Sequence, residues 1–106
     1  NRSARQGGAK RLVELSHPVV EAGVYDAPAG TALVLGNFTY EPIPELKIRL
    51  PVPQAVNRVR SLERGTLPFS VEKASGNPSG GVVSCVLDLG ISDIVLFELV
   101  NSNAVP

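Results

Sequence analysis

The residue types that could do chemistry are few in this chain, and they stand far apart. His17 is the only histidine and Cys85 the only cysteine among the 106 residues. One residue of each type falls short of the ligand set of a zinc site. His17 stands between Ser16 and Pro18, and the proline favours an extended residue in a turn over a catalytic base. We therefore expect no zinc site and no catalytic role for His17.

Cys85 lies in a segment, residues 82–89, in which apolar and polar residues alternate. Val83, Cys85 and Leu87 fall on one side and Ser84 and Asp88 on the other. A thiol on the apolar side is expected to be buried, with its pKa raised rather than lowered. Cys85 is thus predicted to be a core residue and not a nucleophile.

Sugar hydrolysis uses a pair of carboxylates, so the acidic residues are candidates as a group. Those on predicted strands, mostly at outward positions, are Glu14, Glu21, Glu45, Glu63, Glu72 and Glu98, and those at predicted turns are Asp26, Asp88 and Asp93. Each has a local explanation as a solvated residue or a turn former. Asp88 and Asp93 could share a calcium ion across Leu-Gly-Ile-Ser, but turn capping is the preferred interpretation.

Arg58, Arg60 and Arg64 form the one basic cluster, with Glu63 inside it. Nucleic-acid sites carry wider positive charge beside stacking aromatic rings, so no nucleic-acid partner is expected. The cluster is interpreted as an exposed face or a contact with a neighbouring domain.

Aromatic residues decide how well the chain could bind sugars. It has no Trp. We expect its phenylalanines to be buried (Phe38, Phe69 and Phe97), and only Tyr25 and Tyr40 to be surface rings. This weakens the hypothesis that the chain is a dedicated carbohydrate-binding module. The predicted contact surface is therefore Tyr40 with Arg58, Arg60 and Arg64, without a catalytic residue, metal or cofactor.

The segments that must position these residues are short and alternate with a period of two. In residues 45–52, Leu46, Ile48 and Leu50 are expected to point inward and Lys47 and Arg49 outward. Further strands are predicted at 11–15, 19–25, 31–40, 66–72, 82–89 and 94–100, with a long loop at 74–81. Residues 55–64 fit either a strand or a short helix, and we predict a strand. Seven or eight strands with regular turn signals predict an all-β, antiparallel two-sheet β-sandwich of immunoglobulin-like or Greek-key type.

Length and composition fit one such domain. A chain of 106 residues with 43% hydrophobic residues, ten acidic and ten basic, has material for a single core. We expect a linker at residues 1–10, the sandwich at 11–100 and a frayed tail at 101–106. No apolar stretch is long enough for a membrane helix, and no membrane partner is expected. The absence of methionine indicates either a processed product or a piece of a longer polypeptide, and the linker-like residues 1–10 favour the piece.

The order of segments resembles the C-terminal β-sandwich domain that follows the catalytic barrel in glycoside hydrolases, especially β-galactosidase-like and related uncharacterised bacterial enzymes. The resemblance rests on Val-Glu-Ala-Gly-Val at 20–24, Gly-Thr-Ala-Leu-Val-Leu-Gly-Asn-Phe-Thr at 30–39, Leu-Lys-Ile-Arg-Leu at 46–50, Val-Arg-Ser-Leu-Glu-Arg-Gly at 59–65 and Leu-Asp-Leu-Gly-Ile-Ser-Asp-Ile-Val-Leu at 87–96. It is a pattern of strands and turns without a catalytic signature.

The resemblance implies a role outside the chemistry. We expect a non-catalytic accessory domain of a larger carbohydrate-active enzyme, secreted or periplasmic, whose partner is the catalytic domain of the same polypeptide. The chain itself is then expected not to be an enzyme. The alternative is a free-standing immunoglobulin-like module that binds sugar or protein through its loops. A third hypothesis is a small hydrolase whose carboxylates converge only in the fold.

Overall fold

A computed structural model of the chain describes residues 13–74 and 77–99. Nine strands account for most of these residues, and their bounds are β1 Glu14–Leu15, β2 Glu21–Ala27, β3 Gly30–Gly36, β4 Ile43–Val52, β5 Val56–Ser61, β6 Gly65–Leu67, β7 Phe69–Ala74, β8 Asn77–Leu89 and β9 Ser92–Leu99. Within the two described ranges there is no helix that could cross a membrane.

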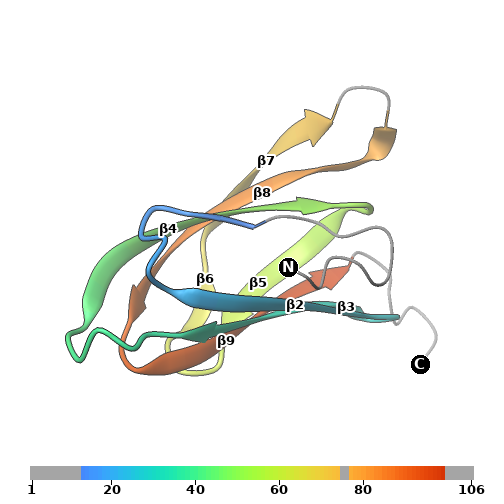
Figure 1. Cartoon of the computed structure of the whole chain (residues 1–106). Coiled ribbons are helices and arrows are strands. Elements are labelled where there is room, and N and C mark those ends of the chain that lie inside the picture. The colour runs from blue at the N-terminus through green and yellow to red at the C-terminus, as the bar shows by residue number, and fades with distance from the viewer. Residues whose placement is uncertain (1–12, 75–76, 100–106) are drawn as a thin grey trace.

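The strands form two antiparallel sheets that pack face to face (Figure 1). The four-stranded sheet has the order β1-β4-β8-β7, and the five-stranded sheet has the order β2-β3-β9-β5-β6. The all-β two-sheet sandwich expected from the sequence is therefore confirmed. Its order is not sequential, because β8 lies between β4 and β7 while β9 lies between β3 and β5.

The core consists of the inward positions of both sheets. Leu46, Ile48 and Leu50 of β4 are fully buried, as their alternation predicted. They face residues of the other sheet such as Leu33 and Phe97, in one continuous cluster. Apolar burial of this kind, at roughly 25 cal/mol per Å² of area removed from water, is the main term that stabilises the sandwich.

Cys85 belongs to this cluster, as expected. Burial raises the pKa of its thiol to about 11, because the interior disfavours the charged thiolate. At neutral pH the side chain is a protonated thiol and packs as a small hydrophobe.

The strand count differs from the expected seven or eight because one predicted strand is two. Pro68 lies between β6 and β7, which belong to different sheets. Proline lacks the N–H that a continuous ladder would need, so the chain changes sheet there. Within the described residues, the strand predicted at 11–15 is the two-residue β1, and residues 56–61 form a strand and not a helix.

The loop predicted at residues 74–81 is wrong for its described part. Asn77–Leu89 is a single strand of 13 residues that pairs with β7 beyond the edge of the core (Figure 1). Gly, Ser and Pro favour loops, but antiparallel backbone pairing with β7 overrides that preference. The linker at 1–10 and the tail at 101–106 lie outside the described residues.

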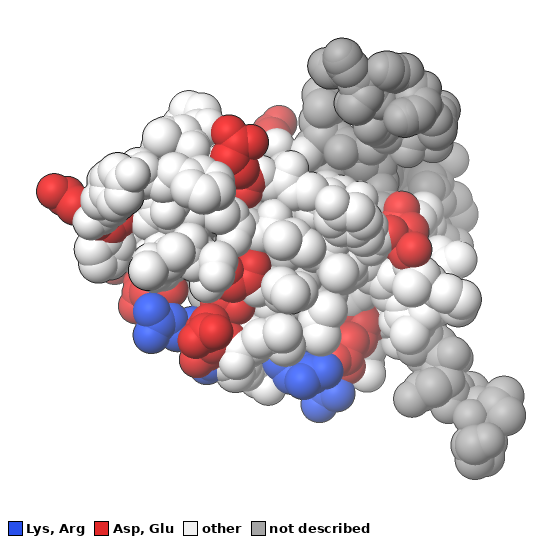
Figure 2. All heavy atoms as spheres, turned by 60° about the horizontal axis from the view of Figure 1, so that its bottom comes forward, with Lys and Arg blue, Asp and Glu red and all other residues white. Residues whose placement is uncertain are grey.

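The outer faces of the two sheets differ in chemistry. On the four-stranded sheet Arg49 is paired with Glu14 at 2.7 Å and Glu72 at 2.9 Å. These bonds raise the pKa of Arg49, Glu14 having the larger effect. On the five-stranded sheet the outward positions include Ala32, Val34, Ile94 and Leu96. Figure 2, seen from the side of that sheet, shows uncharged surface interrupted by separate acidic groups, with basic groups along its lower edge.

Candidate functional site

Exposed apolar side chains gather at one end of the sandwich, which we call the loop end. It is built by the β1–β2, β3–β4 and β8–β9 connections and the β5–β6 turn, away from the last residues of β9 (Figure 1). Its exposed apolar side chains are Val19, Phe38, Tyr40, Leu62 and Ile91. These are five of the nine exposed large hydrophobic side chains in the described residues, so the exposure is concentrated.

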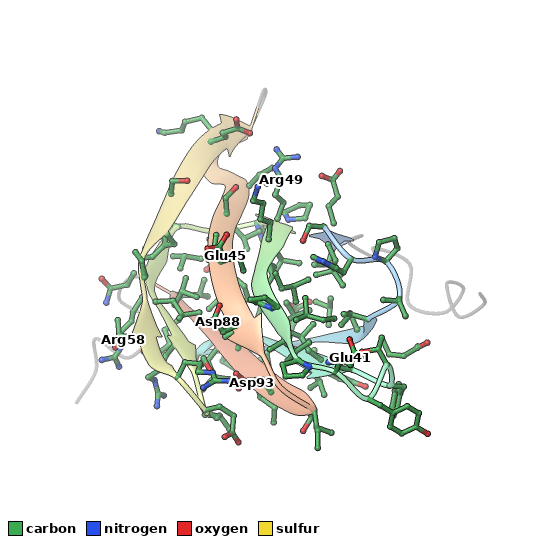
Figure 3. The ribbon with its side chains drawn as sticks, turned by 90° about the vertical axis from the view of Figure 1, so that its left-hand side faces the viewer. Glu41, Glu45, Arg49, Arg58, Asp88 and Asp93 are labelled. Atoms are coloured by element: carbon green, nitrogen blue, oxygen red, sulfur yellow. The ribbon has the colours of Figure 1, made fainter. Side chains whose placement is uncertain are left out.

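The most open of these side chains lie close together. Phe38 is 68%, Tyr40 97% and Ile91 80% exposed. Together with Pro42 and Glu41 they surround a hollow of about 300 Å³ between the β3–β4 loop and the β8–β9 turn. Figure 3 looks onto this end, with Glu41 at its rim. The hollow is apolar with one carboxylate beside it, which suits a contact with another apolar surface.

Asn37 holds the two connections of this hollow together. Its side chain is buried, and Nδ2 donates to the carbonyl of Glu41 at 2.7 Å and to that of Gly90 at 2.8 Å. Its Oδ1 accepts from the backbone N–H and the hydroxyl of Thr39. Both the donor and the acceptor of the Asn37 amide group are thus hydrogen-bonded to the surrounding loops. Because of these bonds, the loop end has a fixed shape before any partner binds.

Tyr40 is strained without being buried. It has a φ of 68°, in the left-handed region that favours glycine. The hydroxyl oxygen of Thr39 lies 3.0 Å from the carbonyl of Glu41 and accepts from the N–H of Glu41 at 3.2 Å, which fixes the surrounding turn. Strained residues of this kind concentrate at functional sites. The prediction that Tyr40 is a surface ring is confirmed.

A buried carboxylate supports the β5–β6 turn, which carries Leu62. Asp93 is 5% exposed, and its carboxylate accepts hydrogen bonds from the hydroxyl of Ser61 and from the backbone N–H groups of Glu63 and Ile94. Ser61 in turn accepts the N–H groups of Glu63 and Arg64. Asp93 does cap a turn, but that turn is the distant β5–β6 connection.

Asp88 has a different hydrogen-bond partner from those of Asp93. Asp88 lies in β8 and accepts the backbone N–H of Glu45, which has a φ of 56° at a bulge of β4. Asp88 belongs to β8 and Asp93 to β9, and Figure 3 labels both on the side turned to the viewer. No group of three or more His, Cys, Asp or Glu side chains in residues 13–74 and 77–99 is arranged to hold a metal. His17 lies exposed in a turn, with Nδ1 at 2.9 Å from the hydroxyl of Ser16.

The structure divides the predicted arginine cluster. Arg58 and Arg60 both bind Glu98 on the outer face of the five-stranded sheet, at 2.7 Å and 2.9 Å. Arg58 and then Arg60 lower the pKa of Glu98 by hydrogen bonds. Arg64 instead lies in the β5–β6 turn and donates from Nε to the carbonyl of Asp88 at 2.9 Å. Tyr40 and Arg64 thus belong to connections of the loop end, whereas Arg58 and Arg60 lie on the outer face of β5.

Several residues of the loop end escaped the sequence analysis. Phe38 was expected to be buried but is exposed, and Phe69 is only partly buried against the core, whereas Phe97 is buried as expected. The alternation along β3 and the residues after it indicates the exposure of Phe38. Leu33, Leu35 and Asn37 all point inward, so Phe38, the next residue, points outward. The same parity could have identified Asn37 as a buried amide.

Comparison with known proteins adds one relationship. No family model matches the chain, and no solved structure matches it. It is 28% identical over 89 residues to the cis-3-hydroxy-L-proline dehydratase of Pseudomonas aeruginosa strain PAO1. The match takes in 84% of this chain but only 14% of that enzyme's length.

This relationship corrects one expectation. The chain was predicted not to be an enzyme, whereas the protein that it resembles is a dehydratase. The resemblance to glycoside hydrolase domains stays a prediction.

Proposed function

We propose that this chain is the β-sandwich domain of a larger enzyme similar to the dehydratase, and that it docks on the rest of that enzyme through the loop end. The observation that carries the proposal is the match of most of the chain to a small share of a much longer enzyme. The reaction class is then the removal of water from a small hydroxylated amino acid.

The loop end supports the docking part of the proposal. Phe38, Tyr40 and Ile91 leave a large apolar area open to water, and such areas on a folded domain mark contact surfaces. Asn37 fixes their arrangement in advance, which lowers the entropic cost of association. Aromatic side chains at the centre of a contact carry much of its binding free energy.

Tyr40→Gly tests this role because stability and docking should respond in opposite ways. Glycine removes the strain at φ 68° and loses no buried contact. The free energy of unfolding of this chain should therefore stay equal or rise by up to about 1 kcal/mol, as judged by urea denaturation. In the complete protein the same change should loosen the domain, seen as faster limited proteolysis between the domains.

The control for this experiment is Val86→Gly, which removes an exposed apolar side chain from β8 of the four-stranded sheet, away from the loop end. It should leave the proteolysis of the complete protein unchanged in pattern. If Tyr40→Gly destabilises this chain, or leaves the complete protein as resistant as before, the docking role is wrong.

A carbohydrate-active parent is the second candidate, favoured by the exposed rings of Phe38 and Tyr40 and by the glycoside hydrolase resemblance. Exposed aromatic rings can stack on sugars. Under this candidate the chain alone would bind glycans and lose that binding in Tyr40→Ala. Under the dehydratase proposal it would not bind glycans.

A further inference from the structure

A groove crosses the outer face of the five-stranded sheet, away from the loop end. It has a volume of about 520 Å³ and runs over β2, β3, β9 and β5. Neighbouring outward positions in the register are Tyr25, Ala32, Leu96 and Arg60 in one row. Gly30, Glu98 and Arg58 form the next row. The groove therefore has an aromatic side on β2 and a cationic side on β5.

The floor of the groove is low because its residues are small. Ala29, Gly30 and Ala32 line it. A side chain at Gly30 would place its Cβ 2.2 Å from the carbonyl oxygen of Phe97, so this position cannot be filled by another residue type without moving the strand. Gly30 therefore leaves this part of the floor without a side chain.

The aromatic side is held in place by Gly23. A Cβ at Gly23 would lie 2.9 Å from Cε1 of Tyr25, so the ring lies over this glycine. Tyr25 is 62% exposed and lines the groove. It offers a fixed ring to a ligand.

The cationic side has donors to spare. Arg58 and Arg60 each use Nε and Nη2 to bind Glu98, one on each carboxylate oxygen. Within residues 13–74 and 77–99, the two guanidinium groups make no other side-chain hydrogen bonds. Each guanidinium therefore keeps N–H donors at Nη1 and a second one at Nη2. On β5 and β9, Glu98 fixes both groups but cancels only one of their two charges, and the second carboxylate of the groove, Asp26, lies on β2. Asp26, at the rim of the groove, accepts the hydroxyl of Thr31 at 2.7 Å.

We propose that this groove is a binding site for a small organic carboxylate with a flat apolar body. The carboxylate accepts the remaining N–H groups of Arg58 and Arg60, and the apolar body lies over Ala32 and Leu96 against Tyr25. Paired guanidinium groups suit a carboxylate because their planar donors match its two oxygens. A ligand without an apolar body would leave the floor and the ring unused.

Benzoate is the probe, titrated into the isotope-labelled chain while backbone amide shifts are followed by NMR. It should shift the amides of Ala32, Leu96 and Glu98 with a dissociation constant of about 1 to 10 mM, as expected of a small single-contact ligand. Arg58→Gln combined with Arg60→Gln should weaken binding by at least about tenfold, the size of one lost charge-assisted hydrogen bond. Tyr25→Ala should weaken it by a smaller factor.

Matched probes and a matched variant separate the alternatives. Benzamide, which has the same ring without the charge, should not bind, and inorganic phosphate should bind more weakly than benzoate. Arg49→Gln removes the ion-paired arginine of the opposite sheet and should leave benzoate binding unchanged. The proposal is overturned if benzoate shifts no groove amide, or if Arg49→Gln weakens benzoate binding as much as the combined Arg58→Gln and Arg60→Gln change does. It is also overturned if an acidic peptide occupies the groove while benzoate does not. None of these outcomes depends on the loop end or on a dehydratase.

Discussion

Asp93→Ala should lower the free energy of unfolding of this chain by about 3 kcal/mol. The change removes a buried carboxylate, leaves the hydroxyl of Ser61 and the N–H of Ile94 without this acceptor, and takes one of two acceptors from the N–H of Glu63. Hydrogen bonds to charged groups contribute about 1.5 to 3 kcal/mol each, and unsatisfied buried groups cost about 1 to 3 kcal/mol. Equilibrium urea denaturation followed by circular dichroism measures the loss.

Two further variants decide whether the network is the cause. Asp93→Asn keeps the shape of the side chain and one acceptor oxygen, so it should lower the free energy of unfolding by about half as much as Asp93→Ala. Asp88→Ala removes an exposed carboxylate with one backbone partner, and it should cost less than about 1 kcal/mol. Equal losses in Asp93→Ala and Asp88→Ala would show that the buried network does not stabilise the β5–β6 turn.

Asn37→Asp should destabilise the chain by about 3 kcal/mol at pH 7. The substitution replaces Nδ2, which donates to the carbonyls of Glu41 and Gly90, with an oxygen that faces the same two oxygens. Buried acceptors that face each other without a proton between them lose the hydrogen bonds and repel. Asn37→Ala, which removes the bonds without the repulsion, should cost about 2 kcal/mol.

The dependence on pH identifies the cause. A protonated acid at position 37 could donate to one carbonyl, so the folded protein raises the pKa of the introduced carboxyl above its unfolded value. A group with a raised folded pKa keeps its stabilising contribution below the unfolded pKa and loses it as pH rises through the folded pKa. The Asn37→Asp deficit should therefore shrink at about pH 4 relative to wild type.

Asn57 provides the control for this second experiment, since it lies exposed on β5. Asn57→Asp should change the free energy of unfolding by less than about 0.5 kcal/mol at both pH values. A deficit of Asn37→Asp that is the same at pH 4 and pH 7 would contradict the hydrogen-bond account of Asn37.

The parts of the fold that depend on alternation were predictable from the sequence. Leu46, Ile48 and Leu50 alternate with polar residues, and Cys85 sits among apolar neighbours at every second position, so burial could be read from local pattern. Pro68 and residues 77–81 were misjudged because the pairing partner decides their structure. Proline divided a strand between two sheets, and pairing with β7 extended β8 through residues that favour loops.

The site was less predictable because its key contacts join distant segments. Asn37 binds Gly90 and Asp93 binds Ser61, across 53 and 32 positions of the chain. Spacing in a sequence carries no information on such pairs. The three arginines looked like one cluster for the same reason, although the β5–β6 turn carries Arg64 away from Arg58 and Arg60.

We propose that this chain is one domain of a larger dehydratase-like enzyme. The most direct measurement is the release of water from cis-3-hydroxy-L-proline, or from a related hydroxylated amino acid, by the complete native protein that contains this chain. We expect turnover that is retained after purification to homogeneity. A complete protein that leaves every hydroxylated amino acid unchanged, while the same preparation is folded by circular dichroism, would contradict the claim.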